Sequence, residues 1–197
     1  ELAIGLMFAA SRKIAKADSG MKNKAWLKKE LVGTEIEGKT LGIVGLGRIG
    51  TMLALKAKGL GMKIIYYDPL SKGVAIGQGV SLDELMSSSD FISLHVPLMP
   101  ETRELINPAA IAKMKKNAVI INTARGGLID EDALYSALKE GRIAAAGLDV
   151  YPEEPYFGKL CELDNIVLTP HIAGSTKEAQ MRIGLELVEL LKKAMQK

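Results

Sequence analysis

Short apolar runs alternate with helix-like segments along most of the chain, and this alternation limits the fold more than any other feature of the sequence. Each run is apolar at neighbouring positions, which indicates a strand buried on both faces, as in a parallel sheet. The predicted strands are Thr40–Gly45, Lys63–Tyr67, Phe91–His95, Ala118–Asn122, Ala144–Leu148 and Asn165–Leu168. Because strands that alternate with helices form right-handed βαβ units, the sequence predicts an α/β fold with a doubly wound parallel sheet in a single domain.

Helix signals lie between and around these strands, as capping residues, a proline suited to a first turn, and one-sided apolar faces. The predicted helices are Arg48–Gly59, one opened by Ser81 and Glu84, one opened by Asn107 and Pro108, Asp130–Glu140, and a long one from the Ser175–Glu178 capping box to near Gln196. The chain thus divides into a leading helix and connector over 1–35, a sheet core over 36–174 and a return helix over 175–197. The apolar leading helix and the return helix are expected to pack on a partner.

The composition excludes several classes of partner. The chain has 26 Lys and Arg against 23 Asp and Glu and no basic block, so no nucleic-acid partner is expected. No apolar run reaches the roughly 18–20 residues that cross a bilayer, and no membrane partner is expected. Cys161 is the single cysteine, which favours a reducing, cytoplasmic setting and an ordinary thiol rather than a nucleophile. The lysine-rich segment 22–29 is predicted to be a solvated connector, and no metal site is predicted.

A glycine motif lies where the first predicted strand ends and the next helix begins. Its three glycines, Gly45, Gly47 and Gly50, follow the pattern G-x-G-x-x-G. The first permits a tight turn, the second lets the backbone approach a pyrophosphate, and the third lets helix and strand pack closely. The helix N-terminus, with the backbone N–H groups of Arg48 and Ile49, is expected to face the phosphates.

An acidic residue ends the second predicted strand. Asp68 lies 18 residues beyond Gly50, near the spacing expected for a carboxylate that accepts hydrogen bonds from the adenosine ribose. A 2′-phosphate at this place would face a negative charge, so NAD is favoured over NADP. The alternative is a turn residue before Pro69. The glycine motif and the Asp68 carboxylate together predict a Rossmann-type site for NAD.

Three more segments lie at predicted strand ends, over 122–130, 148–155 and 169–175. Together with the glycine motif, they resemble the signature segments of the D-2-hydroxyacid dehydrogenase family, in order and spacing. The resemblance covers nearly the whole chain and corresponds to the nucleotide-binding domain of the family and the start of its return helix. It implies NAD-dependent oxidation of a small D-2-hydroxyacid to the 2-keto acid, and a homodimer. It also implies that the N-terminal substrate-domain segment of the family is absent from these residues.

The resemblance implies a catalytic set of Arg125, Glu154 and His171. The arginine fork would hold the substrate carboxylate, and the imidazole would exchange a proton with the substrate oxygen. The glutamate would orient the imidazole and favour its charged form. Glu153 competes with Glu154, but only Glu154 directly precedes Pro155 as in the family pattern. A glutamate at this place argues against the formate dehydrogenase branch, which has a glutamine.

Further cofactor contacts follow from the resemblance. Asp149 is expected either to accept from the nicotinamide carboxamide or to position its loop, and His95 either to line the cleft through its backbone or to have a core or turn role. The remaining residues expected around the cofactor are Pro97, Thr102, Thr123, Ala124 and Ala173.

The substrate is less constrained than the cofactor. The run 174–180 after the predicted catalytic histidine resembles 3-phosphoglycerate dehydrogenases, which favours 3-phosphoglycerate and a place in serine biosynthesis. Glyoxylate or hydroxypyruvate reductases are the alternative within the family. An NAD-binding module of the corepressor type, without turnover, is the alternative from another class.

Overall fold

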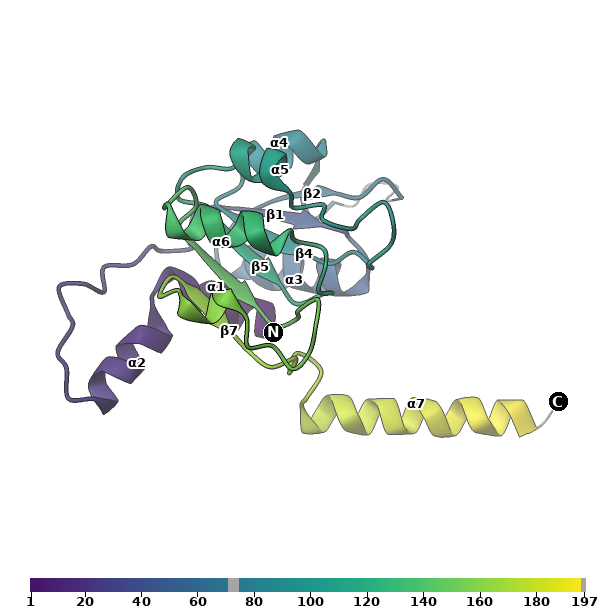
Figure 1. Cartoon of the computed structure of the whole chain (residues 1–197). Helices are drawn as coiled ribbons and strands as arrows, with labels where there is room; N and C mark the ends of the chain where they lie inside the picture. The colour runs from purple at the N-terminus through teal and green to yellow at the C-terminus, as the bar shows by residue number, and fades with distance from the viewer. Residues whose placement is uncertain (71–74, 196–197) are drawn as a thin grey trace.

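A parallel sheet of seven strands forms the centre of the molecule (Figure 1). The structure, a computed structural model, describes residues 1–70 and 75–195. The strands are β1 (Thr40–Val44), β2 (Lys63–Tyr67), β3 (Gln78–Gly79), β4 (Phe91–Leu94), β5 (Val119–Asn122), β6 (Ala145–Leu148) and β7 (Ile166–Leu168). Their order is β3-β2-β1-β4-β5-β6-β7, and every neighbouring pair is parallel. The predicted doubly wound sheet is confirmed, and all six predicted strands form with ends that differ by at most one residue.

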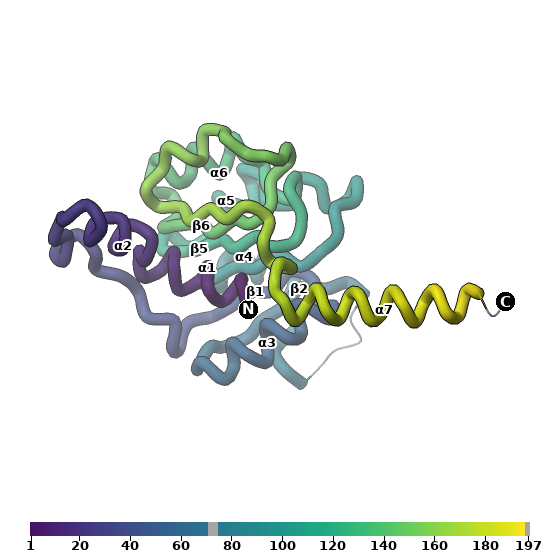
Figure 2. Tube along the Cα trace, turned by 90° about the horizontal axis from the view of Figure 1, so that it is seen from below, coloured from purple at the N-terminus to yellow at the C-terminus, as the bar shows by residue number. Residues whose placement is uncertain are grey.

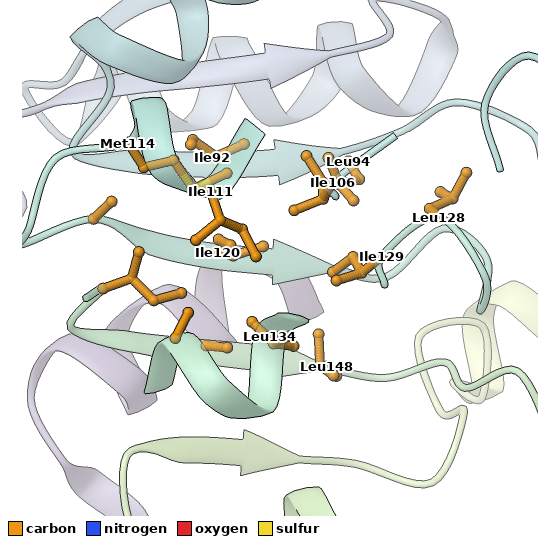
Figure 3. Packing of buried hydrophobic residues seen from close by; sticks show 14 of the residues in the cluster. Ile92, Leu94, Ile106, Ile111, Met114, Ile120, Leu128, Ile129, Leu134 and Leu148 are labelled. Atoms are coloured by element: carbon orange, nitrogen blue, oxygen red, sulfur yellow. The ribbon is translucent and has the colours of Figure 1, made fainter. Parts of the chain in front are cut away.

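Helices cover both faces of the sheet (Figure 1). On one face lie α4 (Leu82–Ser88), α5 (Pro108–Lys113) and α6 (Glu131–Lys139). On the other face lie α1 (Leu2–Ser11) and α3 (Arg48–Gly59). Neighbouring strand residues therefore serve different cores: Ile43 packs among the residues of α1 and α3, and Val44 packs toward α4 to α6. Figure 3 shows the core between the sheet and helices α4 to α6, where Ile92, Ile120 and Leu148 of three strands meet the helices.

The leading helix corrects one expectation. Helix α1 was expected to need a partner outside the chain, but it buries Leu6, Met7 and Ala10 against its own sheet. A second helix, α2 (Ile14–Lys22), was not predicted and buries only Gly20. The connector after it is solvated as predicted, and Trp26 is 77 % exposed.

The return helix α7 (Lys177–Met195) extends away from the sheet in both views (Figures 1 and 2). None of its described side chains is buried, although many are large and apolar. Its cap is one residue later than predicted, because Thr176 Oγ1, rather than Ser175, accepts from Ala179 N at 3.0 Å. The predicted end near Gln196 lies outside the described residues. No helix among the described residues is long and apolar enough to cross a bilayer.

The other two predicted caps, Ser81 and Asn107, form as expected, and Asp130, which was expected to be the first residue of its helix, caps α6 (Glu131–Lys139). The side chains of Ser81, Asn107 and Asp130 each accept a hydrogen bond from the backbone N–H three residues later. Such caps satisfy N–H groups that have no acceptor inside the helix. The two-residue strand β3 and a 3-10 turn, η1 (Lys159–Glu162), were not predicted, because neither is long enough to show a periodic pattern.

A carboxylate ties three strands together at the N-terminal edge of the sheet. Asp90 Oδ2 accepts from Thr40 N at 2.9 Å, while Oδ1 accepts from Lys115 Nζ at 3.0 Å and Asn117 Nδ2 at 3.3 Å. Burial alone would raise the pKa of Asp90, but these donors outweigh it and lower the pKa below the ordinary value. The carboxylate therefore stabilises the fold at neutral pH, and this contribution is lost in acid as Asp90 is protonated.

We expect Asp90→Ala to lower the free energy of unfolding by about 2–3 kcal/mol, because it leaves a strand N–H and a lysine without their charged acceptor. Urea unfolding at pH 7 measures this change. The control is Asp83→Ala, since Asp83 forms an ion pair with Lys113 but is 71 % exposed, and its loss should cost below about 1 kcal/mol. Equal losses in the two variants would contradict the role given to Asp90.

Candidate active site

The glycine loop lies where the strand order changes direction, between β1 and β4. Gly45 follows β1 with φ of +93°, and a Cβ there would lie 2.8 Å from the carbonyl oxygen of His95, which follows β4. Only glycine allows this turn and this approach without strain. In an open parallel sheet, the crevice beyond such a pair of strand ends is where ligands bind.

The two later glycines have different surroundings. A Cβ on Gly50 would collide with the carbonyl oxygen of Gly45, so this glycine lets α3 pack closely on the turn. A Cβ on Gly47 would meet nothing within 4 Å, so the loop is open to solvent on that side. Gly47 is the N-cap of α3 and no side chain caps the helix, which leaves the first-turn N–H groups of Arg48 and Ile49 without helical acceptors. This cradle fits a pyrophosphate.

Asp68 stands beside this cradle. Its Oδ2 accepts from Leu46 N in the glycine loop, and its Oδ1 accepts from Leu70 N, both at 2.8 Å. Each carboxylate oxygen keeps a free lone pair, so the group fits the hydroxyls of a ribose. The bond to Leu70 also makes Asp68 a turn residue before Pro69. Both predicted roles are thus compatible in one side chain, and its contact with a ribose stays a prediction.

His95 follows β4 directly and is partly buried. Its Nε2 is hydrogen-bonded to Ser93 Oγ at 2.8 Å, and burial lowers the pKa of His95 to about 4. The loop that follows is closed by Thr102, whose Oγ1 donates to Pro97 O at 2.6 Å and accepts from Met99 N at 2.8 Å. Pro97 and Thr102 are therefore held together in one loop after β4, and their contact with the cofactor stays a prediction.

The predicted proton-exchanging pair is formed. His171 Nδ1 donates to Glu154 Oε2 at 2.8 Å, and the two side chains are 52 % and 37 % exposed. The hydrogen bond from His171 is the main cause that lowers the pKa of Glu154, and Tyr151 N, which donates to Glu154 Oε1 at 3.1 Å, adds to it. Glu154 is thus a carboxylate at neutral pH. Glu153 is exposed and lies outside this contact.

Asp149 holds the loop that carries His171. The Asp149 side chain is fully buried, and it accepts from Thr169 Oγ1 at 2.6 Å, Ile172 N at 2.9 Å and Ala173 N at 2.8 Å. These bonds correspond to the positioning role, one of its two predicted roles. Since the N–H of Ala173 is engaged here, a contact of Ala173 with the cofactor would have to use its carbonyl or methyl group.

Arg125 is exposed at the end of β5, and its Nη1 donates to Ala124 O at 2.6 Å. Thr123 is half-buried in the same loop.

Two residues of the site were missed in the sequence analysis. Asn122 bonds to the Arg125 loop, and Tyr151 holds Glu154 through its N–H and bonds to Thr169 O through its hydroxyl at 3.0 Å. Both lie within the segments 122–130 and 148–155, but an amide at a strand end or a phenol in a loop carries no chemical signal of its own.

A shallow cleft of about 310 Å³ opens beside the His171–Glu154 pair. Tyr151, Tyr156 and Phe157 form much of its apolar wall, and the exposed Cys161 thiol lines it too. Among the described residues, no group of three or more His, Cys, Asp or Glu side chains is placed to hold a metal ion.

The parallel sheet, the glycine turn at the change of strand order and the acidic residue after β2 define a dinucleotide-binding α/β domain. Residues 4–173 match the family described as "D-isomer specific 2-hydroxyacid dehydrogenase, NAD binding domain". The chain belongs to this family, and its cofactor is therefore NAD.

Named relatives differ in activity. The chain is 52 % identical to the hydroxypyruvate reductase of Thermotoga maritima over 200 residues, and 52 % identical to the D-3-phosphoglycerate dehydrogenase of Methanocaldococcus jannaschii over 201 residues. Each match covers 99 % of this chain but only 65 % and 38 % of the respective relative. A glyoxylate reductase structure from Paecilomyes thermophila superposes with a TM-score of 0.94 at 40 % identity, covering 99 % of this chain and 61 % of that one.

We expect His95 to make the fold less stable in mild acid. The unfolded chain binds a proton on this histidine near pH 6.5, whereas the folded chain binds it only near pH 4. Protonation between these values favours the unfolded state, so stability falls as the pH decreases from 6.5 to 4. Urea unfolding of His95→Asn across this range should show a shallower fall than the parent. His171→Asn, which keeps His95, is the control, and parallel curves for the parent and His95→Asn would refute this account.

Proposed function

We propose that this chain is the cofactor-binding and catalytic part of an NAD-dependent dehydrogenase that oxidises a D-2-hydroxyacid to the 2-keto acid. The observation that carries the proposal is the hydrogen bond between His171 Nδ1 and Glu154 Oε2, at strand ends next to the nucleotide crevice. Arg125 lies at the end of the neighbouring strand β5. A base, its orienting carboxylate and a cation that suits a carboxylate are the groups that this oxidation needs.

His171 acts as the base in this proposal. Because Nδ1 donates to Glu154, the neutral ring keeps its lone pair on Nε2, and this atom takes the proton from the substrate hydroxyl. Glu154 is held on its other oxygen by Tyr151 N, so it stays ionised and fixes the orientation and the tautomer of the His171 ring. In the reverse direction, the same Nε2 returns the proton.

Arg125 holds the substrate carboxylate with its planar fork. When bound, NAD would supply the hydride-accepting or hydride-donating chemistry. The glycine cradle with Arg48 and Ile49 would hold its pyrophosphate, and Asp68 its adenosine ribose. The rest of the NAD molecule would be surrounded by His95, the loop closed by Thr102, and residues 123–124, 149 and 173.

We further propose that a substrate-binding part outside these residues completes the site. Arg125 is exposed and His171 is half-exposed, so both groups are open to water within the described residues. The chain spans less than two thirds of its named relatives, which leaves room for such a part. The apolar surface of α7 suits a contact with it or with a second copy of the chain in a homodimer.

For the substrate we propose 3-phosphoglycerate, which the run 174–180 and several relatives of that name support. The alternative, reduction of hydroxypyruvate or glyoxylate, is favoured by equally similar relatives. Values of kcat/KM for these compounds, measured on the full-length protein by NADH absorbance, decide between them.

We expect the chain to bind NAD at least about fivefold more tightly than NADP, since a 2′-phosphate beside Asp68 meets a like charge at a cost of about 1 kcal/mol even in bulk water. Calorimetric titration with both dinucleotides measures the ratio. Asp68→Asn should weaken NAD binding and lower the ratio of the NADP Kd to the NAD Kd. Equal or tighter binding of NADP by the parent would disprove the assignment of Asp68.

In the full-length protein, His171→Ala should lower kcat by about 10²–10⁴-fold, the usual contribution of a general base, while the Kd of NAD changes less than about twofold. Glu154→Gln should displace the acidic limb of the pH–rate profile. Glu153→Gln is the matched control, because this neighbouring glutamate is exposed and lies outside the pair. A His171→Ala variant that retains at least half of the parent rate would refute the proposed base.

A further inference from the structure

We infer that Asn122 is a positioning residue for Arg125, and this inference rests on the proposed function of Arg125. Asn122 is the last residue of β5 and is 2 % exposed. Its Nδ2 donates to Arg125 O at 2.9 Å, and its Oδ1 accepts from Ala124 N at 3.0 Å. A single amide therefore holds the main chain on both sides of the Ala124–Arg125 peptide bond.

The backbone of Asn122 is itself held by the sheet. It pairs with Leu94 of β4 and Leu148 of β6, and its carbonyl accepts from Asp149 N at 2.9 Å. The side-chain amide thus starts from a rigid strand and reaches into the loop. Because the amide is buried, no solvent replaces its two bonds when it is removed, and both loop groups lose their partner.

The loop is also confined on its far side. A Cβ on Gly126 would collide with the carbonyl of Tyr151, so the chain after Arg125 packs directly on the segment that leads to Glu154. Arg125 is thus fixed by Asn122 before it and by this backbone contact after it. Its guanidinium forms no ion pair within the part of the chain that the structure describes, and apart from the bond of Nη1 to Ala124 O its N–H donors remain available to a carboxylate.

The consequence for function is geometric. Two parallel hydrogen bonds from an arginine fork to a carboxylate need the fork in one orientation. A shift of about 1 Å in a group that orients the substrate can cost about a hundredfold in rate. Asn122 therefore sets how well Arg125 orients a substrate, although Asn122 itself touches neither substrate nor cofactor.

The first test needs no ligand. In the 197-residue chain, the ¹⁵N order parameter of the Arg125 amide should be near 0.85 in the parent and fall below about 0.6 in Asn122→Ala. Asn122→Asp provides a nearly isosteric second variant that keeps an acceptor for Ala124 N but loses the donor to Arg125 O. Asn165→Ala is the matched control, because Asn165 also donates to two backbone carbonyls, of Leu138 and Ala144, and should leave Arg125 unchanged.

The second test uses the full-length protein with oxamate, a carboxylate analogue of a keto acid. Asn122→Ala and Asn122→Asp should raise the inhibition constant of oxamate and the KM of the hydroxyacid about tenfold, the effect of about 1.4 kcal/mol. The Kd of NAD should stay within about twofold of the parent value. Arg125→Lys, which removes the fork itself, should raise the inhibition constant of oxamate and the KM more than either Asn122 variant does.

The two tests separate this inference from the proposed function. An unchanged order parameter, or unchanged oxamate inhibition in variants that fold, overturns the inference while Arg125 keeps its proposed role. If oxamate inhibits the parent and Arg125→Lys equally, the proposed role of Arg125 fails, and the inference that depends on it fails too. If neither Asn122 variant folds, Asn122 serves the fold rather than Arg125, and the inference is again overturned.

Discussion

The common direction of the seven strands is the constraint on which the other features of this molecule depend. Since every neighbouring pair is parallel, every strand ends at the same edge of the sheet, and the loops that carry the chemistry collect there. The burial of both faces maintains this arrangement, because Ile43 and Val44 serve opposite cores. The glycine turn after β1 lies where the strand order changes direction. Gly45 approaches the carbonyl oxygen of His95 closely there, because β4 ends beside β1.

The loops at this edge are held by polar side chains that start from the ends of strands. Asn122 after β5 holds the Arg125 loop, and Asp149 after β6 holds the His171 loop. A buried carboxylate is costly unless donors surround it, and Asp149 has three of them. Loops that would otherwise move thus acquire the rigidity of the sheet. This is what lets His171 and Glu154, from two different loops, meet at 2.8 Å in a site open to solvent.

Part of the candidate site could be predicted because a dinucleotide needs particular residue types at fixed spacing, as at Gly45 and Asp68. Arg125 and His171 were predicted from the resemblance to the family, whose segments could be matched in order along the chain. The fold was readable for a similar reason, since apolar runs at neighbouring positions have few solutions other than a covered parallel sheet. What could not be read were groups whose role is only to hold others. Asn122 has no distinctive chemistry, and the buried side of α1 follows from a contact with strands that begin more than a hundred residues later.

The sequence by itself determined the class of fold, the order of six of the strands, and the glycine loop and acidic residue of a dinucleotide-binding domain. These properties are local, since they depend on periodicity, on caps and on glycine spacing. The candidate catalytic residues followed from the resemblance to the family. The tertiary structure alone decided how the loops are held. It placed Asp149 beneath both ends of the loop that carries His171, set the expected Glu154–His171 contact at 2.8 Å, and left α7 without a covering surface. The physical reason is that such contacts depend on the register of neighbouring strands, which the packing of two cores sets for the whole sheet at once.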